Sequence, residues 1–286
     1  MIIEKSFVSN RHNNRFFFVY IQINEKDFVN LLIQKQELNK MYFNPQNLLN
    51  HISLDCVIFG FHANELKVLL LHMKYSDSWA LPGGFVKIDE SLESAATRTL
   101  EERTGLSDIF LKQFRVFSDP ARSKFNPAVK DMQEAEGLQH LQWFDMRFIS
   151  VGFYALVEFS KVNPKHDSFS DKCEWKSLDE IEDLIIDHKL ILEKALATLR
   201  TQLSYQPIGY NLLPAKFTMP ELQKLYETIL GKPLDRRNFQ RKILSYKILN
   251  KLGERKTGQA NKAPFLYEFK LDNYQKALEN GLSGGW

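Results

Sequence analysis

The sequence predicts an α+β domain followed by a smaller, basic winged helix-turn-helix domain. Its 286 residues exceed the ~100 to 200 residues of one ordinary domain, so two domains are expected. The chain from Thr201 to Trp286 holds 14 Lys and Arg against 7 Asp and Glu, a net charge of +7, whereas residues 1–200 carry −4. This asymmetry predicts a neutral or acidic domain joined to one that approaches polyanions.

The composition excludes several classes of protein. With 44% hydrophobic and 26% charged residues, the chain has enough apolar surface to fold, which excludes a wholly disordered or collagen-like protein. Its two cysteines, Cys56 and Cys173, are too few for a disulfide framework or a four-thiolate zinc site. No run reaches the ~20 apolar residues that a membrane helix needs. We therefore expect a cytoplasmic protein with no membrane partner, and a buried, inert thiol at Cys56.

Hydrophobic patterning predicts the elements of the first domain, which we expect over residues 46–205. They are two strands joined by a turn, a glycine loop, a helix capped by Ser91 and ended by Gly105, two further strands and a last region of helical stretches. Their expected ranges are 54–61, 66–71, 81–84, 92–104, 110–117, 148–159 and 178–200. Residues 1–45 form an extension without an assigned function, in which the pattern fits a strand over 15–23 and a helix over 27–38.

A long segment over residues 119–145 separates the last two strands of this domain, with helical character over 127–141. It is longer than an ordinary hairpin loop. Connections of this length inside a compact domain are usually functional or locally structured, so the segment is a candidate ligand cover.

Residues 84–106 carry a specific motif. They read Gly84-x5-Glu90-x7-Arg98-Thr99-Leu100-Glu101-Glu102-Arg103-Thr104-Gly105-Leu106. This pattern resembles the Nudix box, Gly-x5-Glu-x7-Arg-Glu-U-x-Glu-Glu-x-Gly-U, where U is aliphatic. The preceding Trp79-Ala-Leu-Pro-Gly-Gly-Phe85 is typical of the same family. The resemblance implies a Nudix α/β/α sandwich.

The box departs from the family pattern at its metal ligands. In active Nudix members, glutamates of the box helix gather Mg²⁺ around a diphosphate and help to activate the attacking water. At ~100° per residue, positions 99, 102 and 103 share one face of the helix, and here they are Thr99, Glu102 and Arg103. The formal charge of that face changes from −3 to 0, so a divalent metal loses most of its electrostatic reason to bind. We expect no cofactor and weak or no Mg²⁺-dependent hydrolysis, although enzymatic activity stays open.

Two roles for Glu102 remain: a solvated carboxylate that pairs with Arg98 or Arg103, which is favoured, or a single remaining Mg²⁺ ligand if the chain is a hydrolase. In this family Glu90 and Arg98 chiefly brace the loop and helix, so their presence supports the fold rather than turnover. The residues expected to bind a small-molecule effector are Trp79, Gly83, Gly84, Glu102, Arg103 and Arg122.

The second domain is expected over residues 206–275, with a tail over 276–286 and the boundary between Arg200 and Leu213. A capping box at Thr218 starts one helix, Asp235 caps a second, basic helix over 236–245, and strands over 248–252 and 265–270 enclose a basic loop, the wing. Arg, Lys, Asn and Gln contact phosphates and base edges. The predicted DNA-binding residues are Arg236, Arg237, Asn238, Gln240, Arg241, Lys242, Arg255, Lys256 and Lys262. A solvated basic face on a structural domain is the alternative.

The resemblance extends over residues 50–271. It is carried by Leu213–Thr218, Leu234–Lys242, and Asp187 and His188 followed by Ile191, Leu199 and Arg200. These segments are similar to the Nudix-related transcriptional regulators of bacteria. In that family a Nudix-like domain senses a ligand, dimerises and controls a winged-helix operator binder. Members respond to ADP-ribose or, in a sugar-catabolic branch, to pentoses such as L-arabinose, and the degenerate box with the 119–145 segment favours the sugar-responsive branch.

The resemblance therefore implies a homodimeric, ligand-responsive regulator of double-stranded operator DNA, with a pentose or ADP-ribose as its effector. One alternative is a Nudix hydrolase of nucleoside diphosphate derivatives such as ADP-ribose, against which Thr99 and Arg103 argue. Another is an interaction protein without a DNA role, against which the order of helices and wing argues.

Overall fold

The computed structural model describes residues 2–3, 21–22, 45–74, 76–107, 109–122, 143, 146–254 and 264–282. The chain divides into two compact units, Met1–Asn47 and Leu48–Trp286. In the first unit β1 (Ile2–Ile3) pairs antiparallel with β2 (Ile21–Gln22), which lies in the expected strand over 15–23. The helix expected over 27–38 lies outside the described residues. None of the helices in the described ranges is long and apolar enough to span a bilayer.

The second unit contains a mixed sheet. Its strands are β3 (Leu48–His62), β4 (Glu65–Met73), β5 (Trp79–Ala80), β6 (Gly83–Lys87), β7 (Phe110–Phe117), β8 (Ile149–Val157) and β9 (Ser170–Ser177). The order across the sheet is β5-β4-β3-β8-β7, with β6 also paired to β3 and β9 to β4. β3 and β8 run parallel, whereas the other pairs are antiparallel.

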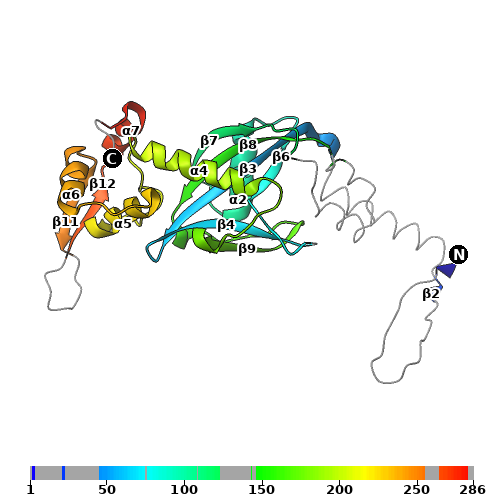
Figure 1. The fold of residues 1–286 in the computed structure, drawn as a ribbon, viewed down its shortest axis with the longest axis horizontal. Helices are drawn as coiled ribbons and strands as arrows, with labels where there is room; N and C mark the ends of the chain where they lie inside the picture. The colour runs from blue at the N-terminus through cyan, green and yellow to red at the C-terminus, as the bar shows by residue number, and fades with distance from the viewer. Residues whose placement is uncertain are drawn as a thin grey trace, which may run out of the picture. The chain divides into compact units, whose positions relative to one another are not determined.

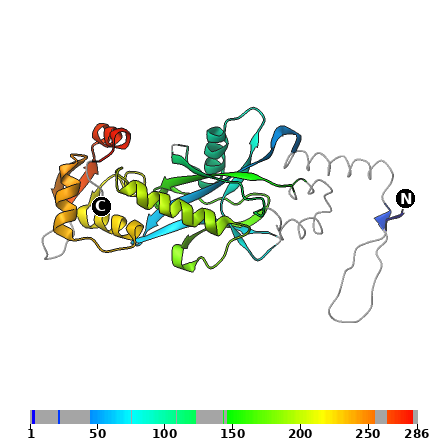
Figure 2. The same cartoon turned by 45° about the horizontal axis from the view of Figure 1, so that its top comes forward.

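Helices cover both faces of this sheet, as Figures 1 and 2 show. The helices are α2 (Leu92–Thr104) and α4 (His188–Leu203). Side chains alternate between the faces of a strand. Val57, Phe59 and Tyr154 therefore pack in one cluster with α4, while Cys56 and Ile58 pack in the other with α2. The expected α/β/α sandwich is confirmed.

Local chemistry explains where α2 begins and ends. The Ser91 side chain accepts a hydrogen bond from the Ser94 backbone N–H, which satisfies one of the free donors of the first turn. Gly105 ends the helix with a φ of 74°, a left-handed conformation that favours glycine. Both ends agree with the sequence prediction.

The structure differs from the expected elements in three places. The stretch predicted as a glycine loop contains Gly83 and Gly84, which begin β6, because they pair with Asp55 and Leu54 of β3. Strand β9 was not predicted, because it contains only two apolar residues, Cys173 and Trp175, although these alternate with polar ones. The helical stretches expected over 178–200 are present as a short 3-10 helix, η4 (Leu178–Glu180), and α4, but α4 ends at Leu203 rather than at residue 200.

The C-terminal part has the winged helix-turn-helix order. Its elements are β10 (Phe217–Thr218), α5 (Met219–Leu230), α6 (Arg236–Ser245), β11 (Leu249–Glu254), β12 (Phe265–Phe269) and α7 (Leu271–Asn280). The three strands form a sheet in the order β10-β12-β11. Helix α7 was not predicted, and the expected start of a tail at residue 276 falls inside it.

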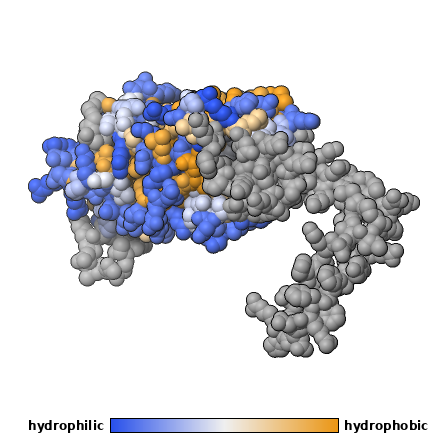
Figure 3. All heavy atoms as spheres, turned by 45° about the vertical axis from the view of Figure 1, so that its right-hand side comes forward, coloured by the Kyte–Doolittle hydropathy of each residue, from blue (hydrophilic) through white to orange (hydrophobic). Residues whose placement is uncertain are grey.

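Most of the coloured residues on the face drawn in Figure 3 are hydrophilic, with hydrophobic ones gathered between them. Buried side chains include Cys56, whose thiol is fully buried and whose pKa is raised by that burial, as expected for an inert cysteine. Large hydrophobic side chains that stay exposed include Val116 and Ile149.

His72 makes the stability of the β4–β9 pair depend on pH. Its Nδ1 lies 2.7 Å from Asp171 Oδ1 and its Nε2 3.2 Å from Asp77 Oδ1. The hydrogen bond to Asp171 raises the pKa of His72 above its ordinary value, with a smaller contribution from Asp77. Protonated His72 therefore stabilises the fold below pH ~6.5, and this contribution is lost as the pH rises through the raised pKa.

We predict that His72→Gln lowers the free energy of unfolding most near pH ~5, and that its difference from wild type shrinks towards pH ~8. Urea unfolding at several pH values measures this difference. Asp171→Asn should give the same trend, because it removes the main cause of the raised pKa. A difference that does not change with pH would show that the ion pair contributes nothing to folding.

Candidate functional site

The brace expected between the loop and the helix of the Nudix box is present. Arg98 donates to both carboxylate oxygens of Glu90, at 2.6 Å and 3.1 Å, and to the Phe85 carbonyl at 2.9 Å. Glu90 also accepts from the Lys87 backbone N–H at 2.8 Å. The hydrogen bonds from Arg98 are the main cause of the lowered pKa of Glu90. The pair therefore holds the loop before α2 in place, as the sequence predicted.

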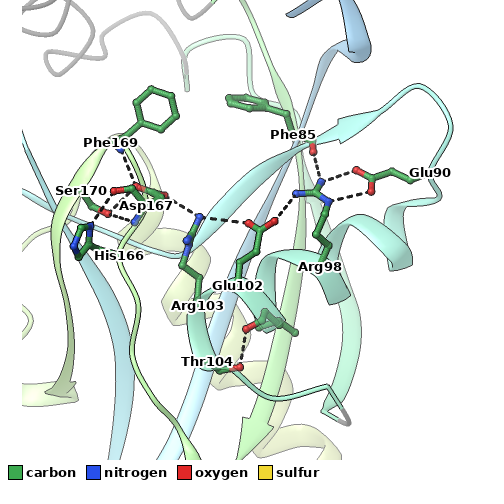
Figure 4. A network of polar contacts seen from close by, with 11 residues as sticks. Phe85, Glu90, Arg98, Glu102, Arg103, Thr104, His166, Asp167, Phe169 and Ser170 are labelled. Carbon is green, nitrogen blue, oxygen red and sulfur yellow. Dashed lines mark hydrogen bonds and ion pairs between the residues drawn. The ribbon is translucent and has the colours of Figure 1, made fainter. Parts of the chain in front are cut away.

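Arg103 occupies the centre of a second group of charges (Figure 4). Its Nη2 lies 3.1 Å from Asp167 Oδ2 and 3.7 Å from Glu102 Oε2. Glu102 Oε1 lies 3.6 Å from Arg98 Nη1, so this carboxylate stands between two guanidinium groups. Asp167 is held in turn by the Phe169 backbone N–H and the Ser170 hydroxyl. The prediction that Glu102 pairs with Arg98 or Arg103 is confirmed for both arginines.

Residues 99, 102 and 103 share a helix face, but they differ in burial. Thr99 is 1% exposed and Arg103 8% exposed, whereas the Glu102 side chain is 47% exposed. Thr99 Oγ1 and Arg103 Nε are buried and have no hydrogen-bond partner among the described residues. A Cβ added to Gly84 would lie 2.9 Å from Thr99 Oγ1, so the strand and the helix touch there. This part of the site is closed by the protein itself.

The box does not fit the divalent metal that its fold family implies. Mg²⁺ prefers several oxygen ligands that converge on one point. In this box a hydroxyl and a guanidinium replace two carboxylates, and the remaining Glu102 is engaged by two cations. Among the described residues, no group of three or more His, Cys, Asp or Glu side chains could hold a metal ion.

A second polar cluster lies at the N-terminus of α4. Arg122 donates to both carboxylate oxygens of Asp187 at 2.9 Å, and its Nη2 lies 3.5 Å from Asp55 Oδ2. Asp55 also accepts from the Ser150 hydroxyl at 2.5 Å. His188 accepts from the Leu81 backbone N–H through Nδ1, so its Nε2, 3.4 Å from Asp55 Oδ1, carries the proton in the neutral ring. The cluster fastens β3, β8 and α4 together.

The structure separates the predicted effector residues into groups. Gly84, Glu102 and Arg103 belong to the box. Gly83 and Arg122 belong to the cluster, since a Cβ at Gly83 would lie 3.0 Å from Asp55 Oδ1. Trp79 instead contacts His72 edge-on and the Lys176 ammonium, which lies 4.5 Å from the ring centroid.

Sequence reasoning missed Asp167 and the residues around Arg122. Asp167 lies far from the box in the chain, and no local pattern connects the two. Asp55 had a usable signal, because it is a carboxylate inside the apolar run Leu54–Phe61 and a buried charge needs a partner. Asp187 and His188 were noted for the resemblance alone, without a role.

The basic helix α6 presents most of its predicted DNA-binding residues to solvent. Phe239 and Ile243 are buried, while Arg236, Arg237, Asn238 and Arg241 are exposed and Gln240 and Lys242 are half-buried. Asp235 caps the helix by accepting from the Asn238 backbone N–H at 2.9 Å. Arg241 donates to the Asn238 amide oxygen at 2.9 Å. Arg255, Lys256 and Lys262 of the predicted wing lie outside the described residues.

Three buried tyrosines hold the connection between α4 and the winged helix. Tyr154 of β8 donates to Gln202 of α4, and Tyr274 of α7 donates to the Pro207 carbonyl at 3.0 Å. The Tyr226 hydroxyl of α5 accepts from the Ile208 backbone N–H at 3.3 Å. Burial raises the pKa of each of these hydroxyls. Elements of the sheet and of the winged helix therefore fasten the same short segment.

A Nudix sandwich joined to a winged helix with an exposed basic helix defines a class of protein: a DNA-binding module fused to a domain of a ligand-binding fold. Residues 49–199 match the model of the NUDIX domain, and residues 209–269 match that of the NrtR DNA-binding winged helix domain. The chain belongs to the Nudix-related transcriptional regulators.

Proteins of similar sequence or structure match most of this chain. The chain is 29% identical to the ADPR responsive transcriptional repressor NtrR of Acinetobacter baylyi over 231 residues, which are 78% of this chain and 83% of that protein. The crystal structure of Shewanella oneidensis NrtR, 26% identical, covers 83% of this chain and 100% of its own with a TM-score of 0.64. The same regulator complexed with a 27mer DNA gives a TM-score of 0.65 at the same identity and coverage.

We predict that Asp187→Ala lowers the free energy of unfolding by about 3 kcal/mol, because it leaves the buried Arg122 guanidinium without its bidentate partner. Urea unfolding at neutral pH measures the change. The matched control is Asp179→Ala, which removes an exposed carboxylate from η4 and should change stability by less than about 0.5 kcal/mol. Equal effects of the two substitutions would contradict the structural role of the cluster.

Proposed function

We propose that this protein is a cytoplasmic transcriptional regulator whose Nudix domain binds ADP-ribose and thereby controls the affinity of the winged helix for operator DNA. One observation carries the proposal. A single compact unit joins a Nudix box, in which Arg98 and Arg103 engage Glu102, to an exposed basic helix α6. The first feature favours binding over bond cleavage, and the second favours DNA as the partner.

ADP-ribose is the effector that the relatives favour. The Acinetobacter baylyi relative is described as ADPR responsive, and its similarity covers most of both chains. The pentose expectation rested on the degenerate box and on segment 119–145, and the relatives give it no support. We therefore give up the hypothesis of a pentose effector and propose ADP-ribose as the effector instead.

The arrangement of the box supports binding without hydrolysis. Hydrolysis of a diphosphate in this fold needs metal ions to polarise the phosphorus and to activate water. Glu102 already faces two guanidinium groups, and Thr99 offers a hydroxyl in place of a carboxylate. The charge that would attract a divalent cation is therefore neutralised within the protein.

Operator binding by a homodimer is the simplest use of one recognition helix per chain. Two-fold symmetry would place two α6 helices over half-sites about one DNA turn apart, or a multiple of it. The exposed face of α6 provides Arg237 and Arg241 for the major groove.

The deciding experiment selects a duplex from a random-sequence library with the purified protein and then measures its affinity by fluorescence anisotropy. We predict a selected palindromic site and a fall in affinity when ADP-ribose is added. In parallel, chromatography of ADP-ribose incubated with the protein and Mg²⁺ should show no AMP. Failure to select any sequence, or an affinity that ADP-ribose leaves unchanged, would sink the proposal, as would turnover at an ordinary enzymatic rate.

We predict that Arg237→Ala weakens binding to the selected site by about 1 to 3 kcal/mol, because the substitution removes a donor to a base edge. The loss should be smaller on a scrambled duplex, since non-specific binding depends mainly on phosphate contacts. Lys172→Ala, which removes an exposed cation from β9, serves as the control and should leave the affinity unchanged. Equal losses on both duplexes would assign Arg237 to phosphate contact instead.

A further inference from the structure

Arg103 carries a positive charge into the place where the family pattern has a metal-binding carboxylate. Its side chain is only 10% exposed, and its Nη2 lies within 4.0 Å of carboxylates from two separate elements, Glu102 of α2 and Asp167 before β9. A buried guanidinium needs such partners, because an unpaired charge is costly to remove from water. The two carboxylates thus converge on one cation.

The backbone holds the segment around Asp167 against the end of α2. Lys165 donates its backbone N–H to the Arg103 carbonyl at 3.0 Å, and Asn163 donates to the Thr104 carbonyl at 2.9 Å. The Asp167 carboxylate is itself fixed by the Phe169 backbone N–H at 3.0 Å and the Ser170 hydroxyl at 2.7 Å. Its position therefore does not depend on Arg103 alone, so the carboxylate should stay in place when residue 103 is changed.

The hydrogen-bonding groups around position 103 are not fully satisfied by the described residues. Arg103 Nε and Thr99 Oγ1, one helical turn apart, are both buried without a partner among the described residues. Buried polar atoms are normally paired. The guanidinium contacts its carboxylate partners through Nη2, whereas its Nε is buried without a partner among the described residues.

We propose that Arg103 is a built-in cation that replaces the divalent metal of the Nudix box, and that Glu102 and Asp167 are the carboxylates of a latent divalent-cation site which Arg103 keeps closed. Asp167 belongs to this site although it lies outside the box. The proposal implies that effector binding needs no metal, and this consequence rests on the proposed function. The latent cation site itself does not depend on the proposed function.

The first test measures Mn²⁺ binding to the full chain by isothermal titration calorimetry. Wild type should show no saturable binding in the millimolar range. Arg103→Glu adds a third carboxylate beside Glu102 and Asp167, so its affinity for Mn²⁺ should exceed that of wild type by at least about ten-fold. Adding Asp167→Asn to this variant should remove most of the gain. Arg115→Glu makes the same charge change on an exposed residue of β7 and should give no gain.

A second variant tests the proposal even if Arg103→Glu misfolds. Circular dichroism would detect misfolding of either variant. Arg103→Gln removes the internal cation without adding a carboxylate, and it should bind Mn²⁺ more weakly than Arg103→Glu but more tightly than wild type. Saturable Mn²⁺ binding by wild type would overturn the proposal. A folded Arg103→Glu or Arg103→Gln protein without any gain would also overturn it.

The second test compares ADP-ribose affinity in EDTA and in excess Mg²⁺, and we expect the two dissociation constants to agree within about two-fold. Binding that requires Mg²⁺ would overturn the built-in cation while leaving the regulator function intact. Absence of ADP-ribose binding in both conditions would instead overturn the proposed function, and the Mn²⁺ titrations would still decide the latent site.

Discussion

The charge buried at position 103 determines what the Nudix box of this protein can do. A guanidinium removed from water requires carboxylate partners, and here it takes Glu102 and Asp167. Those carboxylates are then engaged inside the protein, and Arg98 further neutralises Glu102. The helix, the preceding loop and the segment before β9 are thereby joined in one ionic network without a metal (Figure 4). Arg103, which stands where the family pattern has a metal-binding carboxylate, thus also adds contacts between separate parts of the domain.

Helix α4 links the sheet of the Nudix domain to the winged helix. At its N-terminus, Asp187 and His188 belong to the buried cluster around Asp55 and Arg122. Near its C-terminus, Arg200 donates to the Ile229 carbonyl of α5 at 2.8 Å. Residues of the sheet, of α4 and of the winged helix form one continuous hydrophobic core, so the two parts do not pack as independent bodies.

Local signals in the sequence predicted the box and the helix-turn-helix. No such signal predicted the contacts between distant segments. Ser91, Gly105, Thr218 and Asp235 act as caps within a few residues of the helices they end or begin, so their roles can be read from spacing. The parallel pairing of β3 with β8 joins segments about a hundred residues apart, and no local pattern encodes it. The partnership of Asp167 with Arg103 depends on that tertiary arrangement, which explains why the sequence pointed to Arg103 but not to its partner.

The connection after α4 restricts how the winged helix can respond to a change in the Nudix domain. Tyr154, Tyr226 and Tyr274 come from three elements, and each has a buried hydroxyl bonded to the stretch between Gln202 and Ile208. Moving α4 alone would separate Tyr154 from Gln202 and leave buried polar groups unpaired, at a cost of about 1 to 3 kcal/mol for each group. A movement that carries α4, the connection and the winged helix together keeps the bonds from Tyr226 and Tyr274. It strains the bond from Tyr154 and the contacts of Asp187 and His188 at the start of α4. Under the proposed control of DNA binding by a ligand, the movement of α4 that costs the least free energy therefore carries the winged helix with it as one body.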